Sequence, residues 1–221
     1  MASEEPETAE VAAKEADAEK EADEPCPAVV ADEPAQPSTR RRKPLKVELG
    51  QLTEKNVGQL KKLNTATFPV YYKDQFYQDL LKFLDYSRLG YYCDILVSSI
   101  CCRLEDRPQL GGKALYIMTL SVLKPYQRFS FASQLIQWAI DKAQSKDGLN
   151  DDVQEIYLHV QTSNTGALTF YKRFGFEITE EIKNYYKKID PPDCFVLRRA
   201  LNGGKLAPTN GVAKEDAAGE A

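Results

Sequence analysis

The chain has 221 residues, a formal net charge of −4 and a hydrophobic fraction of 43%. That length suits one medium-sized domain with tails, and no apolar run reaches the roughly 18 residues of a membrane-spanning helix. The five cysteines are odd in number and form no Cys-x-x-Cys pair, so we expect an intracellular protein without a disulfide framework or a metal site.

The two ends of the chain differ in composition from its middle. Residues 1–39 carry twelve acidic side chains and two lysines, a net charge of −10, and residues 203–221 carry a net charge of −1, which leaves +7 for residues 40–202. The acidic N-terminal segment buries too little apolar surface to offset its conformational entropy, so residues 1–43 are predicted to be a disordered tail. We also expect no secretory signal in this tail. Residues 203–221 form a second predicted disordered tail. The predicted folded domain is residues 44–202.

Apolar side chains recur along this domain with the period of a strand or of a helix. Thr53 and Asn164 are predicted helix caps, Pro69 ends the first helix, and Gly175 ends the last in the left-handed backbone that glycine permits. The expected helices are 53–68, 74–85, 130–145 and 165–174. The expected strands are 45–49, 89–93, 95–104, 114–122, 155–161, 176–182 and 195–201. This order predicts the α/β class, with a mixed, mostly antiparallel sheet flanked by helices.

One strand–loop–helix junction carries the first functional signal. The strand that ends at Val122 leads through a basic loop into the helix that begins near Ser130. A helix N-terminus placed after a strand offers unpaired backbone N–H groups and a partial positive charge, and both suit a pyrophosphate. Taken alone the pattern is weak, because an ordinary basic loop has the same appearance.

The loop has a more specific resemblance. Residues 127–132, Gln-Arg-Phe-Ser-Phe-Ala, resemble the acetyl-CoA motif Gln/Arg-x-x-Gly-x-Gly/Ala of the GNAT N-acetyltransferases, with Ser130 in place of the central glycine. Four further segments resemble the catalytic subunits of NatE-type N-alpha-acetyltransferases; they are residues 68–72, 116–120, 157–161 and 184–187. The resemblance covers residues 45–201 in order. It implies a single GNAT domain that moves the acetyl group of acetyl-CoA to a protein's N-terminal amine, with Met followed by an apolar residue preferred.

The catalytic residues that the resemblance implies are Tyr116 and His159. An N-terminal ammonium has a pKa of about 7.7–8.0 and must lose a proton before it attacks, so a base near neutrality is useful. His159 is the only histidine of the chain, and strand alternation places it on the face of Tyr157 and Gln161. We expect His159 and Tyr116 to relay the proton through a water. The alternative is a core histidine whose hydrogen bonds are satisfied.

The remaining site residues are also assigned by the resemblance. Residues expected to bind acetyl-CoA are Leu120, Val122, Gln127, Arg128, Phe129, Ser130, Phe131, Ala132, Asn164 and Tyr171, of which Tyr171 also faces the departing thiolate. Residues expected to line a slot for an extended peptide are Phe68, Pro69, Val70, Tyr72, Met118, Tyr185 and Tyr186. A backbone N–H near Val122 or Leu123 is expected to hold the oxyanion. The alternative for the aromatic residues is helix capping and sheet packing.

Ser130 replaces the central glycine of the acetyl-CoA motif, so the sequence is compatible with other functions as well. If its φ is positive, the serine Cβ costs roughly 1–2 kcal/mol, about tenfold in cofactor affinity. If φ is negative, its hydroxyl is free to donate to a phosphate. A second hypothesis is therefore a non-catalytic scaffold subunit of a ribosome-associated N-acetyltransferase complex, and a third is a protein lysine acetyltransferase.

The expected partners follow from the same resemblance. They are a protein N-terminal peptide, other N-acetyltransferase subunits of a NatA-type complex, and the ribosome, without a membrane and without sequence-specific nucleic-acid binding. The preferred interpretation of the basic run at residues 40–43 is a solvated charge cluster, and the alternative is nuclear import or ribosomal-RNA contact. We expect a cytoplasmic protein, with the nucleus as a second compartment.

Overall fold

The computed structural model describes residues 45–108, 111–145, 152–187 and 189–201. The tails predicted at 1–43 and 203–221, and the basic run at 40–43, lie outside these described residues. Within them, no helix combines the length and apolar character that crossing a bilayer requires. The same ranges contain no group of three or more His, Cys, Asp or Glu side chains placed to hold a metal ion.

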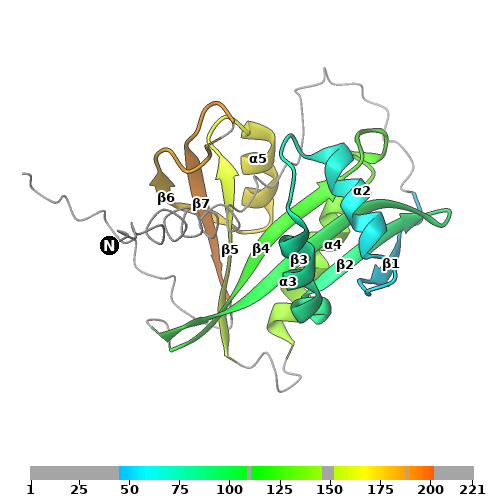
Figure 1. Ribbon diagram of the computed structural model, residues 1–221. Coiled ribbons are helices and arrows are strands. Elements are labelled where there is room, and N and C mark those ends of the chain that lie inside the picture. Colours follow the sequence, from blue (N-terminus) through cyan, green and yellow to red (C-terminus); the bar gives the residue numbers. More distant parts are fainter. Residues whose placement is uncertain (1–44, 109–110, 146–151, 188, 202–221) are drawn as a thin grey trace, which may run out of the picture.

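A single mixed sheet of seven strands organises the described part of the chain (Figure 1). Its spatial order is β1-β2-β3-β4-β5-β7-β6. The strands are β1 Glu48–Gln51, β2 Ser87–Tyr92, β3 Ile95–Arg107, β4 Gly112–Val122, β5 Val153–Gln161, β6 Glu177–Ile182 and β7 Cys194–Ala200. Neighbouring strands are antiparallel except β4 and β5, which run parallel. The mixed, mostly antiparallel sheet predicted from the sequence is confirmed.

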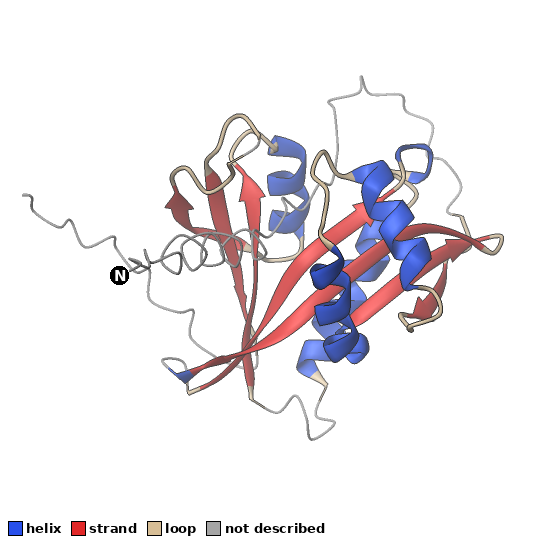
Figure 2. Cartoon of the chain, in the orientation of Figure 1, coloured by secondary structure: helices blue, strands red, loops and turns tan. Residues whose placement is uncertain are grey.

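Helices cover both faces of this sheet (Figure 2). They are α2 Val57–Thr67, α3 Asp74–Leu80, α4 Phe131–Gln144 and α5 Thr165–Arg173, with 3₁₀ turns at Leu81–Tyr86 and Lys124–Tyr126. Leu60 of α2 packs in one buried cluster with Tyr116, whereas Leu135 of α4 packs in another with Leu115. Because adjacent strand residues point to opposite faces, α2 and α3 lie on one side of the sheet and α4 and α5 on the other.

Several predicted boundaries and turns are confirmed. Asn164 caps α5, since its Oδ1 accepts the Ala167 N–H at 3.0 Å, and Gly175 follows the helix with φ +75°. The hairpin turn between β2 and β3 has positive φ at both Cys93 and Asp94, as tight hairpin turns require.

Three local predictions are wrong. The strand expected at 45–49 is Glu48–Gln51, because pairing with β2 begins only at Glu48. Thr53 does not cap α2: the helix begins at Val57, and the Thr53 N–H instead donates to Asn56 Oδ1 at 2.8 Å in the preceding turn. The helix expected at 74–85 ends at Leu80 and continues as a 3₁₀ turn, where Phe83 has a non-helical φ of −126°. Apolar spacing does not separate an α-helix from a short 3₁₀ segment.

Candidate active site

A β-bulge at Met118 separates β4 from β5. Cys101 of β3 pairs with Thr119, but Cys102 pairs with Ile117, so β4 contains one extra residue at Met118. The parallel pairing of β4 with β5 ends at Tyr116 and Tyr157, just before this bulge. Bulges bend a strand and end its pairing, so the two strands diverge from here to their carboxyl ends, as Figure 1 shows.

The divergence leaves backbone groups of β4 without a strand partner. The Leu123 N–H donates to the Val97 carbonyl at 2.9 Å. This bond shows which residues of β4 direct their backbone N–H groups toward β3 and which direct them away, since the direction alternates along the strand. Leu120 and Val122 then direct their backbone N–H groups away from β3, toward the side that β5 has left. Val122 therefore remains a candidate oxyanion donor. Leu123 does not, because its N–H is occupied by Val97.

The loop between β4 and α4 is closed by a side chain. Gln127 Nε2 donates to the Val122 carbonyl at 3.2 Å, so this predicted cofactor residue braces the loop. Arg128 and Ser130 both adopt a left-handed backbone, with φ of 67° and 71°. The positive-φ alternative considered for Ser130 is therefore the one observed. In this conformation the serine hydroxyl makes no capping hydrogen bond to α4, and the helix begins without a side-chain cap.

The first residues of α4 point their side chains inward. Phe131 is 1% exposed and packs with Val97 and Val122, while Phe129 and Ala132 border the same cluster. Packing of these side chains fixes the N-terminus of α4 next to the end of β4. The helix thus presents backbone N–H groups, rather than side chains, to an anion at this position.

Helix α5 contributes one capping residue and one buried hydroxyl. The Asn164 amide oxygen is engaged as the cap of α5. Tyr171 is fully buried, and its hydroxyl has no hydrogen-bond partner among the described residues. Burial, with a smaller contribution from Cys102, raises the pKa of Tyr171, so this phenol stays protonated and able to donate.

Tyr116 and His159 meet where β4 and β5 part. The Tyr116 hydroxyl lies 3.2 Å from His159 Nδ1. The two residues come from adjacent strands and share the face covered by α2 and α3, as predicted from strand alternation. The structure places them in direct contact.

Burial sets the charge state of both groups. It lowers the pKa of His159 to about 4, an effect that Arg198 and Arg107 reinforce and Glu105 opposes. It raises the pKa of Tyr116 well above its ordinary value, and the phenols of Tyr185, Tyr157 and Tyr186 add to this. Both side chains are therefore neutral at pH 7, and burial holds the pKa of His159 below the near-neutral value expected from the sequence. When the imidazole proton is on Nε2, Tyr116 donates to Nδ1.

A polar network behind this pair was not predicted. Tyr157 stacks under Tyr116 with ring centroids 4.7 Å apart and donates its hydroxyl to Glu105. Glu105 also accepts from Arg103, at 2.7 Å from Nη2, and from Arg107 at 3.2 Å. The clue available in the sequence was strand alternation, which places Tyr157 on the same face as His159.

The predicted peptide slot is partly assembled on this face of the sheet. Phe68 and Tyr72, from the loop between α2 and α3, pack in one buried cluster with Met118 and Tyr116. The Phe68 and Tyr72 rings meet edge to face at a centroid distance of 5.8 Å. Val70 is partly buried against the same cluster and Pro69 is exposed.

The second predicted wall of the slot lies on the loop between β6 and β7. The Tyr185 ring is stacked on His159 with centroids 4.6 Å apart and an interplanar angle of 10°. Tyr186 is 5% exposed and meets Tyr185 edge to face. Both tyrosines therefore lie beside the Tyr116–His159 pair, as the peptide-slot interpretation requires.

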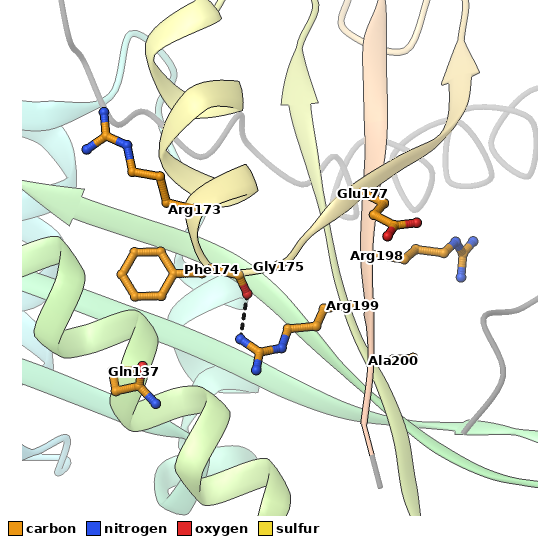
Figure 3. A pocket seen from close by; sticks show the side chains of 8 residues that line it. All are labelled: Gln137, Arg173, Phe174, Gly175, Glu177, Arg198, Arg199 and Ala200. Carbon is orange, nitrogen blue, oxygen red and sulfur yellow. Dashed lines mark hydrogen bonds between the residues drawn. The ribbon is translucent and has the colours of Figure 1, made fainter. Parts of the chain in front are cut away.

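A cavity of about 560 Å³ occurs elsewhere, between α4, the end of α5 and β7 (Figure 3). It contains none of the predicted site residues. The Arg173 and Arg198 side chains point to opposite sides in Figure 3, and Arg199 donates to the Phe174 carbonyl. These guanidinium groups do not converge on one point, so the candidate active site remains the divergence of β4 and β5 rather than this cavity.

A parallel strand pair that opens at a bulge, followed by a helix N-terminus, defines an acyl-CoA-binding α/β fold. The Acetyltransferase (GNAT) family model matches residues 57–176, and the chain belongs to this family.

Two curated relatives cover most of the chain. It is 43% identical over 171 residues to N-alpha-acetyltransferase 50 of Danio rerio, covering 77% of this chain and 98% of the relative. It is 45% identical over 164 residues to the Probable N-acetyltransferase san of Drosophila melanogaster, covering 74% and 85%. Among solved structures, Arabidopsis thaliana Naa50 in complex with the bisubstrate analogue CoA-Ac-MVNAL matches with 45% identity and a TM-score of 0.63, covering 69% of this chain and 97% of that one.

Proposed function

We propose that the chain is an N-alpha-acetyltransferase that transfers the acetyl group of acetyl-CoA to the N-terminal amine of proteins, preferring Met followed by an apolar residue. The observation that carries this proposal is the direct contact of Tyr116 and His159 at the divergence of β4 and β5, beneath aromatic side chains from two loops. The similarity to N-alpha-acetyltransferase 50 and to a peptide-analogue complex supports it.

The described residues suit acetyl-CoA, the acetyl donor of this family. Leu120 and Val122 offer backbone groups that no strand pairs, and the N-terminus of α4 offers N–H groups to a pyrophosphate. The buried Tyr171 hydroxyl has no hydrogen-bond partner among the described residues, and a thioester sulfur can supply one. Acetyl-CoA brings an activated thioester, so a protein nucleophile is not needed.

Proton transfer falls to the pair of neutral side chains. At pH 7 roughly a tenth of an N-terminal amine is already uncharged, so a strong base is not required. Through a water, the Tyr116 oxygen receives the proton of the attacking amine while its own proton moves to His159 Nδ1 across the 3.2 Å contact. The Val122 N–H stabilises the oxyanion, and Tyr171 donates to the departing thiolate.

The slot explains the proposed choice of substrate. Phe68, Val70 and Met118 supply apolar surface for the side chains of the first two substrate residues, while Tyr72, Tyr185 and Tyr186 supply phenols for its backbone. Pro69 limits the freedom of the loop that carries Phe68, which lowers the entropy lost on binding. In the cell we place this activity in the cytoplasm, beside partner N-acetyltransferase subunits and the ribosome.

A peptide assay tests the proposal. The purified chain is incubated with acetyl-CoA and, separately, with a Met-Leu peptide, a Ser-Glu peptide and an N-terminally blocked peptide that contains lysine. We expect α-amine acetylation that is fastest for Met-Leu. Lysine acetylation alone supports the lysine acetyltransferase hypothesis, and no transfer by folded protein supports the scaffold.

A further inference from the structure

The loop between β6 and β7, residues 183–193, is anchored by one carboxylate. Asp193 Oδ1 accepts the backbone N–H of Asn184 at 2.9 Å, and its Oδ2 lies 2.9 Å from Lys183 Nζ. Asp193, the last residue of the loop, thus contacts Lys183 and Asn184, the first two residues of the loop. Asn184 has a left-handed backbone with φ 56°, a conformation that this N–H contact helps to fix.

The returning limb of the loop is tied to the end of β5. Gln161, two residues after His159, donates its Nε2 to the Pro191 carbonyl at 2.8 Å. The Thr162 N–H donates to the Asp193 carbonyl at 3.1 Å. Asp193 therefore connects the strand that carries His159 with the residue that precedes Tyr185.

This connection determines where Tyr185 lies. The Tyr186 N–H donates to the Pro192 carbonyl at 2.8 Å, so hydrogen bonds hold the backbone on both sides of Tyr185. Between them the phenol ring lies flat on His159 at a centroid distance of 4.6 Å. Without the Asp193 carboxylate, the loop keeps the hydrogen bond of the Tyr186 N–H but loses that of the Asn184 N–H.

We propose that Asp193 is a positioning residue of the enzyme: its carboxylate holds the β6–β7 loop so that Tyr185 covers His159 and shapes the peptide slot. This inference rests on the proposed function, in which His159 takes part in proton transfer from the substrate amine and Tyr185 binds the substrate backbone. Asp193 itself touches neither ring, and its effect passes through the backbone of Asn184.

Glu181 provides a matched control. Its carboxylate also pairs with Lys183, at 2.6 Å from Nζ, but no hydrogen bond joins it to the loop backbone in the described structure. Glu181→Gln and Asp193→Ala both remove a negative charge beside Lys183. Only Asp193→Ala removes the acceptor of the Asn184 N–H.

The single histidine makes the geometry measurable without catalysis. One imidazole Cε1–H resonance reports on His159, and a ring stacked on it shifts this resonance upfield. We expect Asp193→Ala to move the resonance toward its position in Tyr185→Ala, while Glu181→Gln leaves it at the wild-type position. In wild type we expect a nuclear Overhauser effect between Cε1–H and the Tyr185 ring protons; its absence overturns the proposal even if Asp193→Ala does not fold.

Kinetics then test the role in the reaction. For Asp193→Ala we expect kcat/KM for a Met-Leu peptide to fall at least about tenfold while the acetyl-CoA Kd stays within about twofold. Asp193→Asn keeps an oxygen acceptor for the Asn184 N–H and should recover at least about half of the wild-type kcat/KM. An unmoved resonance in Asp193→Ala, or equal losses in Asp193→Ala and Glu181→Gln, contradicts the proposal. If wild type acetylates no peptide while the resonance moves as expected, the proposed function fails and the placement of Tyr185 by Asp193 stands.

Discussion

The hydroxyl of Tyr116 and the Nδ1 of His159 lie 3.2 Å apart, on two parallel strands that stop pairing at Tyr116. The strand divergence and the two side chains proposed to transfer protons therefore lie at the same level of the sheet.

This contact predicts strongly coupled variants. Tyr116→Phe keeps the ring stacked on Tyr157 but removes the hydroxyl, and His159→Ala removes its acceptor. Each should lower kcat about a hundredfold, the usual contribution of a proton-transfer group, with little change in acetyl-CoA affinity. Since the two act as one relay, the double variant should be about as slow as the slower single variant. Steady-state kinetics of wild type, the two single variants and the double variant check this. If the fold-loss of kcat in the double variant equals the product of the two single losses, Tyr116 and His159 act independently and not as one relay.

The pKa of His159 predicts how stability depends on pH. A folded-state pKa of about 4, below the ordinary value near 6.5, means that the folded protein resists protonation of this group more than the unfolded chain does. The contribution is therefore present above about pH 6.5 and is lost as pH falls toward 4. From about pH 7 to about pH 5 the free energy of unfolding should drop by about 2 kcal/mol more in wild type than in His159→Gln.

Urea unfolding of both proteins measures that difference. NMR titration of the single imidazole gives the pKa directly. A midpoint near 6.5 would contradict the buried, neutral His159 on which the proton relay depends.

Ser130 predicts a variant that gains stability. Its left-handed backbone, φ 71°, is strained for serine, and glycine adopts this conformation without that cost. Ser130→Gly should raise the free energy of unfolding by about 1 kcal/mol. Ser133→Gly, inside the first turn of α4, is the control and should lower it by about 0.5 kcal/mol. Chemical denaturation measures whether the free energy of unfolding rises or falls in each variant. Destabilisation of both variants would contradict the strain at Ser130.

Tyr171 predicts opposite effects on stability and activity. Its hydroxyl is buried without a partner among the described residues, which costs roughly 1–3 kcal/mol in a protein interior. Tyr171→Phe should therefore raise the free energy of unfolding while lowering kcat, because we propose that the hydroxyl donates a hydrogen bond to the departing thiolate. Denaturation and kinetics on one preparation test both effects. Lower stability with unchanged kcat would assign Tyr171 to packing alone.

Some features set by local sequence were predictable, although the cap assigned to Thr53 was wrong, whereas features set by pairing across the sheet were not predicted. The cap at Asn164 and the stop at Gly175 each depend on one residue's backbone or side chain, and both were confirmed. The bulge at Met118 depends on the relative register of β3 and β4, which a single sequence does not reveal. The contacts of Asp193 were hidden for the same reason, because they join opposite ends of the loop between β6 and β7.

The candidate site shows the same division. Strand alternation placed His159 and Tyr157 on one face, but only the structure brings Glu105 and two arginines to the Tyr157 hydroxyl. The charge of that network contributes to the pKa of His159. Burial is the main cause of the lowered pKa of His159, and Arg198, Glu105 and Arg107, all distant in the chain, modify it.

Calorimetric titration with acetyl-CoA tests the central claim most directly. The claim is that the strained loop at Ser130 and the freed edge of β4 still bind the acetyl donor beside Tyr116 and His159. We predict saturable heat with one site per chain and a Kd at or below the micromolar range, equivalent to about −8 kcal/mol or better. Folded protein that gives no binding heat up to about 1 mM ligand would contradict it.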